Sequence, residues 1–87
     1  MVRERLLDVS ALEPPEPLVQ VVDAAATLQP GEYLRARLPR EPYPLYPLLE
    51  ERGFEFRRLP TMASAFEILI WRRDDAAVRV ALKPSAP

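Results

Sequence analysis

The sequence contains neither cysteine nor histidine among its 87 residues. Without thiols the chain forms no disulfide and offers no thiolate nucleophile, and without imidazole it lacks the side chain most often used as a general base. The same two residue types supply most ligands of zinc, copper and haem iron. Carboxylates remain as ligands for hard metals, but no Asp-rich loop with calcium-binding spacing gathers them. The sequence therefore predicts no catalytic residue, no metal site and no cofactor.

An excess of charge and a long hydrophobic run are also missing. Twelve basic residues stand against thirteen acidic ones, so the chain as a whole lacks the positive charge that nucleic acids and anionic lipids attract. Its apolar runs are a few residues long, and residues 1–10 have no apolar signal-peptide core. We therefore expect a cytoplasmic protein whose partners are neither membranes nor nucleic acids.

Asparagine is absent and lysine occurs once, whereas arginine and proline each occur eleven times. This composition is typical of a GC-rich or heat-adapted prokaryote, although codon bias alone could give most of it. A melting midpoint in the ordinary mesophile range would reject the thermophile hypothesis. Length and a hydrophobic content of 48% indicate one small globular domain.

Two periodicities alternate along the chain. Alternation of apolar and polar residues predicts strands, and apolar residues spaced three and four apart predict helices. The strands are expected at 3–10, 32–39, 54–59 and 65–72, and the helices within 16–31 and 40–54. Residues 60–64, with the sequence PTMAS, suit a hairpin loop. The order βαβαββ predicts an α+β fold, a two-layer sandwich of a mixed four-stranded sheet with both helices on one face.

Proline and glycine mark the ends of the helices. Pro17 suits the first turn of the first helix, where a missing N–H costs little, and Pro30 with Gly31 ends that helix. Pro47 is tolerable only in or beside the first turn of the second helix, and Gly53 predicts its left-handed C-terminal cap. The apolar stripes of the two helices are Leu18, Val21, Val22, Ala25 and Leu28, and Leu45, Leu48 and Leu49.

The chain divides into a domain at 1–72 and a C-terminal tail at 73–87. The tail begins with charged residues and ends in proline, serine and alanine. Between the charged start and the end of the tail, apolar residues alternate with other residues, which predicts an extra strand over 76–82. The alternating residues are Val78, Val80 and Leu82.

The sheet face opposite the helices mixes charge with a large aromatic ring. Candidate contact residues on it are Arg35, Arg37, Arg57 and Trp71, and the face also carries Glu55, Glu67 and Leu69. Trp71 is exposed unless the tail, a second copy of the chain or a partner covers it. The arginines alternatively form a basic stripe for RNA, but the interleaved glutamates argue against this use.

The segment DVSALEPPEP, residues 8–17, resembles the signature D-x-R-G-L-x-C-P-x-P of the TusA/SirA-like family of small sulfur-carrier proteins. It matches at Asp8, at Leu12 and over residues 15–17. The segment LQPGEYL, residues 28–34, resembles that family's turn between helix and strand. The family has the same βαβαββ order, so the resemblance implies a TusA/SirA-like fold for residues 1–72.

Two departures from this signature concern function. Ala11 replaces the glycine, and Pro14 occupies the place of the cysteine that carries the persulfide. A sulfur carrier needs a thiolate at a helix N-terminus, so this chain is not expected to carry sulfur. The segment REPYPLYPLLEERGF, residues 40–54, resembles a cysteine-lacking branch of the fold, an uncharacterised domain family often encoded beside or fused to hemerythrin-like domains.

The sequence LEPPEP, residues 12–17, predicts a rigid proline corner. Its prolines lack N–H groups and its glutamates repel anions, so it is a poor phosphate cradle. A right-handed βαβ unit places the starts of both helices at one sheet edge, so residues 40–47 are expected beside this corner. Candidate partner-binding residues at this edge are Glu13, Pro14, Pro15, Glu16, Arg40, Tyr43 and Tyr46. The structural alternatives are that the prolines only delimit helices and that the tyrosines pack against the first helix.

Three functional hypotheses follow from the sequence. The first is a non-enzymatic interaction or regulatory module that docks a protein or a small apolar ligand at the proline and tyrosine edge. The second is an accessory protein or enzyme of sulfur-transfer or nitrogen-oxide metabolism that works through Arg40, Glu13 and Glu16. The third, homo-oligomerisation through the open sheet face, is compatible with either.

Overall fold

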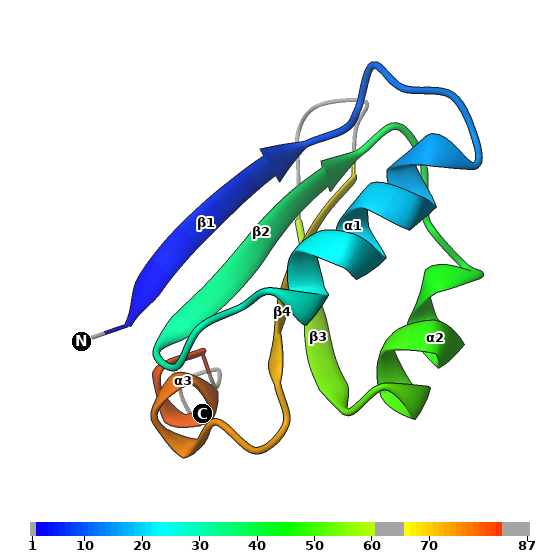
Figure 1. The fold of residues 1–87 in the computed structure, drawn as a ribbon. Helices are drawn as coiled ribbons and strands as arrows, with labels where there is room; N and C mark the ends of the chain where they lie inside the picture. Colours follow the sequence, from blue (N-terminus) through cyan, green and yellow to red (C-terminus); the bar gives the residue numbers. More distant parts are fainter. Residues whose placement is uncertain (1, 61–65, 83–87) are drawn as a thin grey trace.

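The computed structural model describes residues 2–60 and 66–82 (Figure 1). Its elements in chain order are β1 (Arg3–Asp8), α1 (Glu16–Ala26), β2 (Glu32–Leu38), α2 (Leu45–Glu51), β3 (Phe54–Leu59), β4 (Phe66–Arg72) and α3 (Ala76–Leu82). All six elements expected for the domain are present, each within a few residues of its predicted bounds. The predicted hairpin loop lies outside the described residues except for Pro60.

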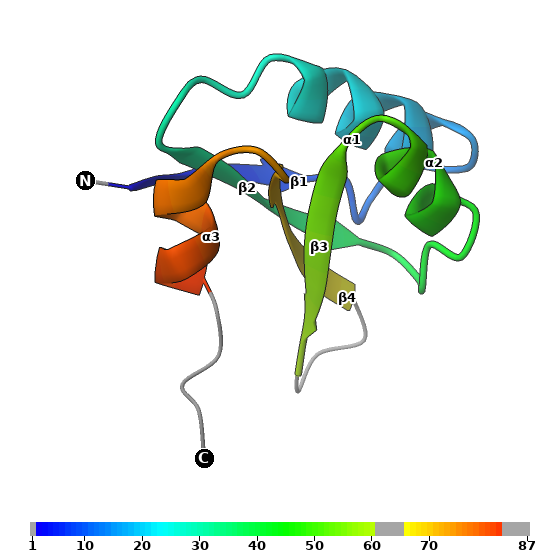
Figure 2. The ribbon, with the colours of Figure 1, turned by 90° about the horizontal axis from the view of Figure 1, so that it is seen from below.

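The four strands form one mixed sheet in the order β1-β2-β4-β3. Strands β1 and β2 are parallel and joined through α1, whereas β4 runs antiparallel to both of its neighbours. Ala36 of β2 lies opposite Leu7 of β1 and Ile68 of β4. Helices α1 and α2 cover the same face of the sheet (Figure 2). The predicted α+β sandwich is confirmed.

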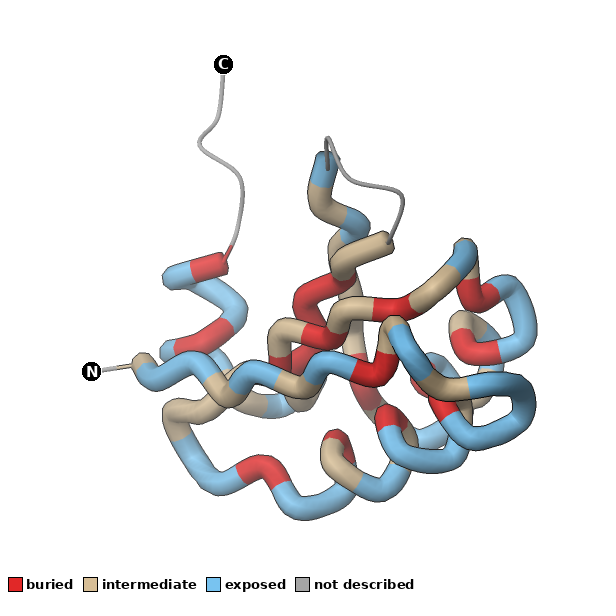
Figure 3. Tube along the Cα trace, turned by 90° about the horizontal axis from the view of Figure 1, so that it is seen from above, coloured by how far each residue is buried: buried red, intermediate tan, exposed pale blue. Residues whose placement is uncertain are grey.

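The main core lies between this sheet face and the two helices, where the buried positions of the trace gather (Figure 3). The alternation read from the sequence holds in β2, because Leu34, Ala36 and Leu38 are buried there. Of the predicted helical stripes, the fully buried members are Val21, Ala25, Leu28, Leu45 and Leu49, and the others are half-buried. Local periodicity is therefore sufficient to place the core.

Proline precedes both helices of the domain, and a glycine follows α2. The predicted end of α1 at Pro30 and Gly31 was wrong, because α1 already ends at Ala26, where the next backbone N–H caps the last turn. Helix α1 starts without a side-chain cap, directly after Pro15, and Pro17 lies buried in its first turn. Helix α2 starts after Pro44 in the same way, with Pro47 at its third residue. Gly53, which follows the end of α2, adopts φ of 84°, so the predicted left-handed C-terminal position is confirmed.

Replacing Gly53 by alanine is expected to lower the free energy of unfolding by about 1 kcal/mol, because residues other than glycine are strained at positive φ. A Cβ atom at this position would meet nothing within 4 Å, so the loss comes from the backbone alone. Urea denaturation measures it. Gly53→Asn is the control, since asparagine tolerates this conformation better, and a Gly53→Ala protein as stable as the wild type would contradict the prediction.

The extra strand predicted over 76–82 was wrong, because these residues form the helix α3. Val78 and Leu82 lie four residues apart on one helical face and are buried, whereas Val80 between them is 75% exposed. The backbone N–H groups of Val78 and Arg79 bond to Asp75, which begins the first turn. In a strand Val80 would share the face of Val78 and Leu82, whereas in a helix it points away from them, as its exposure shows.

Helix α3 packs against the sheet face that α1 and α2 leave free, at one end of the sheet (Figure 2). Leu69, Trp71, Val78 and Leu82 form a second, smaller core there. Trp71 is consequently only 8% exposed. Of the three covers that the sequence left open for this ring, the chain's own tail provides one.

Candidate functional site

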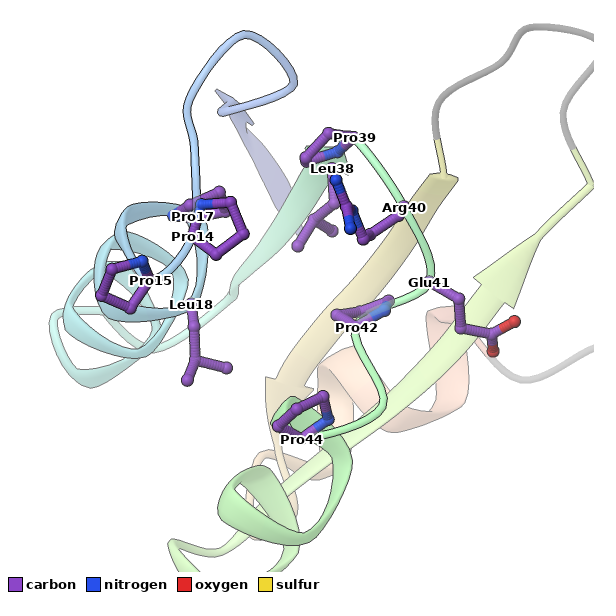
Figure 4. Close-up of a pocket in the computed structure, with 10 residues that line it drawn as sticks. All are labelled: Pro14, Pro15, Pro17, Leu18, Leu38, Pro39, Arg40, Glu41, Pro42 and Pro44. Atoms are coloured by element: carbon purple, nitrogen blue, oxygen red, sulfur yellow. The ribbon is translucent and has the colours of Figure 1, made fainter.

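A groove of about 270 Å³ separates the start of α1 from the segment that joins β2 to α2. Figure 4 shows the prolines of the two segments facing each other across it. We call it the proline groove. Its lining residues are Pro14, Pro15, Pro17, Leu18, Leu38, Pro39, Arg40, Glu41, Pro42 and Pro44.

The groove lies at this edge because β1 and β2 are parallel. Their carboxyl ends therefore meet on one side of the sheet, and the backbone N–H of Val9 donates to the carbonyl of Arg37 there at 2.9 Å. Beyond this point one chain segment turns into α1 and the other into α2. Short turns end both segments, with the N–H of Glu16 bonded to the carbonyl of Glu13 and that of Leu45 to the carbonyl of Pro42. The two proline-rich sequences are thus neighbours in space, as the βαβ topology predicts.

The groove is apolar and poor in hydrogen-bond donors. Six of its ten lining residues are prolines, which have no backbone N–H, and two are leucines. The peptide bond between Pro14 and Pro15 is cis. Such a surface has little to offer a phosphate or a sulfate, which a helix N-terminus binds through free N–H groups. It can instead enclose an apolar or aromatic side chain by contact between carbon atoms.

The two charged residues of the lining differ in their partners. The Glu41 carboxylate accepts hydrogen bonds from Arg58 Nη1 at 2.6 Å and from the Tyr46 hydroxyl at 2.9 Å. Burial favours the neutral form of Glu41, but these bonds outweigh it and hold the pKa of Glu41 below its ordinary value. Arg40 takes part in none of the ion pairs formed among residues 2–60 and 66–82. The groove therefore has one cation on its wall that is available to a ligand.

The structure brings some of the predicted partner-binding residues together and separates others. Pro14, Pro15 and Arg40 line the groove, whereas Glu13 and Glu16 are exposed beside it. Tyr43 and Tyr46 lie outside the lining. The lining also contains Pro17, Glu41, Pro42 and Pro44, which lie within the segments 12–17 and 40–47 expected at this edge. Sequence reasoning missed Leu18, Leu38 and Pro39; the two leucines were assigned to apolar faces of their elements, and nothing local shows that they also reach the groove.

The two tyrosines have different surroundings. Tyr43 is 69% exposed and remains available for contact. Tyr46 is half-buried, stacks on Phe56 with ring centroids 4.7 Å apart, and donates its hydroxyl to Glu41. The alternative that the tyrosines pack inward is therefore correct for Tyr46, although its ring packs against β3 and not against α1. Tyr46 supports the segment that carries the groove.

Alkaline titration tests this role of Tyr46. Burial, with the hydrogen bond to the Glu41 carboxylate, raises the pKa of Tyr46 from 10.0 to about 12. Because the folded pKa lies above the unfolded one, the stabilisation is complete below about pH 10 and is lost as the pH rises toward 12. Absorbance of tyrosinate measures the ionisation. Tyr46→Phe should remove the step at highest pH and Tyr43→Phe should keep it; an unchanged step in Tyr46→Phe would contradict the assignment.

The second sheet face carries a network of ion pairs where α3 does not cover it. Glu67 bonds Arg35 and Arg37, each at 3.0 Å, and Arg35 also bonds Glu4 at 3.0 Å. Asp8 shares this part of the face, and the hydroxyl and the N–H of Ser10 lower its pKa. Positive charge on this part of the face is therefore matched by carboxylates.

The other two predicted contact residues of this face lie under α3. The indole N–H of Trp71 donates to Glu55 at 2.9 Å, and Glu55 also pairs with Arg79 of α3. A guanidinium N–H of Arg57 donates to the carbonyl of Leu82. Trp71 is buried under α3, so its ring is covered by the tail, one of the covers that the sequence left open.

Among residues 2–60 and 66–82, no three acidic side chains come close enough to form a metal site. In the same part of the chain, every helix is too short or too polar to span a bilayer.

Comparison with curated proteins and with solved structures gives no match. A family model described as "Uncharacterized conserved protein (DUF2249)" matches residues 6–72. The matched range contains the whole proline groove and ends at the last residue of β4, so α3 lies beyond it. The chain belongs to the DUF2249 family of uncharacterized conserved proteins.

Proposed function

We propose that this protein is a small non-catalytic interaction module that receives an aromatic side chain of a partner protein in the proline groove. The observation that carries the proposal is the lining itself, six proline rings and two leucines around a hollow of about 270 Å³. Proline and aromatic rings recur as complementary surfaces in peptide recognition. Here the module supplies the prolines, so the partner supplies the aromatic ring.

The size and stiffness of the groove support this occupant. Its volume of about 270 Å³ lies just below the range of small-molecule sites, about 300–1,000 Å³, which suits one or two large side chains. Proline rings have few rotamers to lose, so little conformational entropy opposes binding. Arg40 on the wall favours a carboxylate near the aromatic ring of the partner.

The resemblance to sulfur carriers supports a role of this surface in contact with a partner. The βαβαββ order and the proline signature support a fold shared with the TusA/SirA-like family, in which Pro14 takes the position of the sulfur-carrying cysteine. Pro14 lies on the groove wall, so the position used for chemistry in that family would serve here for contact. We place the module in the cytoplasm, without cofactor, and with neither membrane nor nucleic acid as partner.

Leu18→Glu tests the groove, with Val19→Glu as its matched control. Leu18 lines the groove, whereas the neighbouring Val19 on α1 is exposed outside it. Titration of ¹⁵N-labelled protein with N-acetyl-tryptophanamide should shift the amide signals of residues 14–18 and 40–44. Leu18→Glu should weaken this binding at least about ten-fold, because it places a charge against the apolar probe, and Val19→Glu should leave it unchanged.

The same pair of variants decides whether a protein partner uses the groove. A partner captured from the native cells by wild-type and Val19→Glu proteins but lost with Leu18→Glu would agree with the proposal. Probe-induced shifts that spread over the surface, or equal binding by all three proteins, would reject it. Light scattering on the free protein shows separately whether copies of the chain associate.

A further inference from the structure

We propose that the sheet face beneath α3 is a second docking surface, specific for a short amphipathic helix of a partner, and that α3 occupies it within the same chain. We call it the helix-docking face; Leu69 and Trp71 of β4 with Glu55 and Arg57 of β3 make it up. It lies on the opposite side of the sheet from α1 and α2 (Figure 2), so the inference is independent of the proline groove.

The contacts of α3 define what the helix-docking face recognises. Val78 and Leu82, four residues apart, pack on Leu69 and Trp71. One residue after the first apolar anchor, Arg79 Nε pairs with Glu55 at 3.1 Å. Arg57 donates to the carbonyl of Leu82 at the end of the helix. The face therefore takes two apolar side chains at i and i+4, a basic residue at i+1 and the free carbonyl of a helix C-terminus.

Three observations indicate that α3 is separable from this face. Helix α3 has seven residues, and helices shorter than about 12 residues are marginal in water, so the face itself must hold α3 in shape. The receiving strands lie within the matched family range and α3 lies beyond it. A hollow of about 520 Å³ remains beside α3, between Trp71 and the exposed Val80, so the helix does not fill the surface available to it.

Charge complementarity favours a partner helix over an unspecific apolar cover. The two charged side chains of the face have opposite signs, since Glu55 accepts from Arg79 and Arg57 donates to the carbonyl of Leu82. They lie two residues apart on the side of β3 that faces α3. A partner helix in the reverse direction would bring its basic residue toward Arg57 and leave Glu55 without a cation. The helix-docking face thus fixes the direction of the bound helix as well as its apolar spacing.

The single tryptophan of the chain reports on this face, because it lies under α3. In the full-length protein, Val78→Asp should displace α3, shift Trp71 emission to the red and expose the indole to iodide quenching. Ala77→Asp, at an exposed position of the same helix that does not line the hollow beside Trp71, is the matched control and should change neither. An acetylated and amidated peptide of sequence RDDAAVRVAL, residues 73–82, should restore the blue-shifted emission of Val78→Asp.

The peptide with aspartate in place of both Val78 and Leu82 is the negative control and should not restore the emission. The wild-type protein should bind the peptide at least about ten-fold more weakly than Val78→Asp, because its tethered α3 competes at an effective concentration in the millimolar range. If Val78→Asp loses its cooperative unfolding transition, Leu82→Asp at the end of the helix is used in its place.

The outcomes separate the alternatives. Restoration by the wild-type peptide alone establishes a face that accepts a helix in trans. Failure of restoration at millimolar peptide would overturn the proposal, as would unfolding of both variants, since α3 would then be an inseparable part of the core. If light scattering shows a dimer of the wild-type chain, and this dimer forms by exchange of α3, the helix bound at this face belongs to a second copy. That result would overturn a partner protein as the occupant.

Discussion

Ile70→Ala is expected to lower the free energy of unfolding by about 3 kcal/mol, since truncation of a buried Ile or Leu to alanine commonly costs about 2–5 kcal/mol. Ile70 is fully buried in β4, a strand with a neighbour on each side, where it lies opposite Leu34 of β2 and Phe56 of β3. Strands bonded on both sides cannot move inward to fill the space that three missing carbon atoms leave. The loss therefore includes the transfer of the removed atoms and most of the cavity term.

Leu6→Ala is the control for this substitution. Leu6 lies in the same sheet but is 68% exposed, so its truncation should change the free energy of unfolding by less than about 0.5 kcal/mol. Equilibrium unfolding in urea measures both variants, and an unchanged slope would show that the denatured state is unaffected. For a domain whose total stability is about 5–15 kcal/mol, Ile70→Ala should visibly lower the melting temperature. A loss below about 1 kcal/mol would mean that β4 is less firmly packed than its burial indicates.

The strands could be predicted from the sequence because backbone geometry dictates their period. In β2 the apolar residues Leu34, Ala36 and Leu38 alternate with polar ones, and in β4 Ile68 and Ile70 alternate with Leu69 and Trp71. The pattern of β2 does not fit a helix of 3.6 residues per turn. The apolar run of β4 has no period of its own, and its β-branched and aromatic residues indicate the strand. The position of the proline groove was likewise predictable, since parallel strands bring the segments that follow them to one edge.

Helix α3 could not be predicted because its seven residues fit two periods. Val78, Val80 and Leu82 alternate as in a strand, but Val78 and Leu82 alone also have the spacing of one helical face. Only the presence of Leu69 and Trp71 on an uncovered sheet face decides between them, and that contact is not local in the sequence.

The surroundings of Tyr46 and Glu41 also depend on contacts that no local pattern reveals. Tyr46 stacks on Phe56, ten residues further along the chain, and Glu41 receives its shortest hydrogen bond from Arg58, seventeen residues away. Both partners come from β3, whose register against β4 determines where these side chains lie. A tyrosine near a proline-rich turn gives the same sequence signal whether it faces a partner or its own sheet.

Glu67→Gln is expected to lower the free energy of unfolding by about 2 kcal/mol, between the effect of an exposed ion pair, about 0–1 kcal/mol, and that of breaking a buried one, about 3–5 kcal/mol. The Glu67 side chain is largely buried and bonds two guanidinium groups, whereas Arg35 and Arg37 are each at least a third exposed. Solvent therefore screens the arginines in part. The amide keeps the shape of the side chain but leaves Arg37 without a carboxylate partner and Arg35 with Glu4 alone.

Salt distinguishes this charge effect from a loss of packing. The difference between Glu67→Gln and the wild type should shrink in 1 M NaCl, where the screening length is about 3 Å, whereas a packing defect would persist. Arg3→Gln is the control, because the Arg3 side chain is mostly exposed and its one ion pair, with Glu32, is 3.7 Å long. This substitution should change the free energy of unfolding by less than about 0.5 kcal/mol. In a double-mutant cycle, Arg37→Gln and Glu67→Gln should couple by about 1 kcal/mol.

The same substitution tests whether this sheet face binds nucleic acid. In the wild type the carboxylates of Glu4, Glu67 and Asp8 outnumber the guanidinium groups of Arg35 and Arg37 in the uncovered hollow. We therefore expect no binding of single-stranded poly(U) at low salt. Glu67→Gln leaves two carboxylates and two guanidinium groups in this hollow. The hollow then has no net positive charge, so this variant should also fail to bind poly(U). Salt-dependent binding by the wild-type protein would mean that other arginines form a surface for nucleic acid.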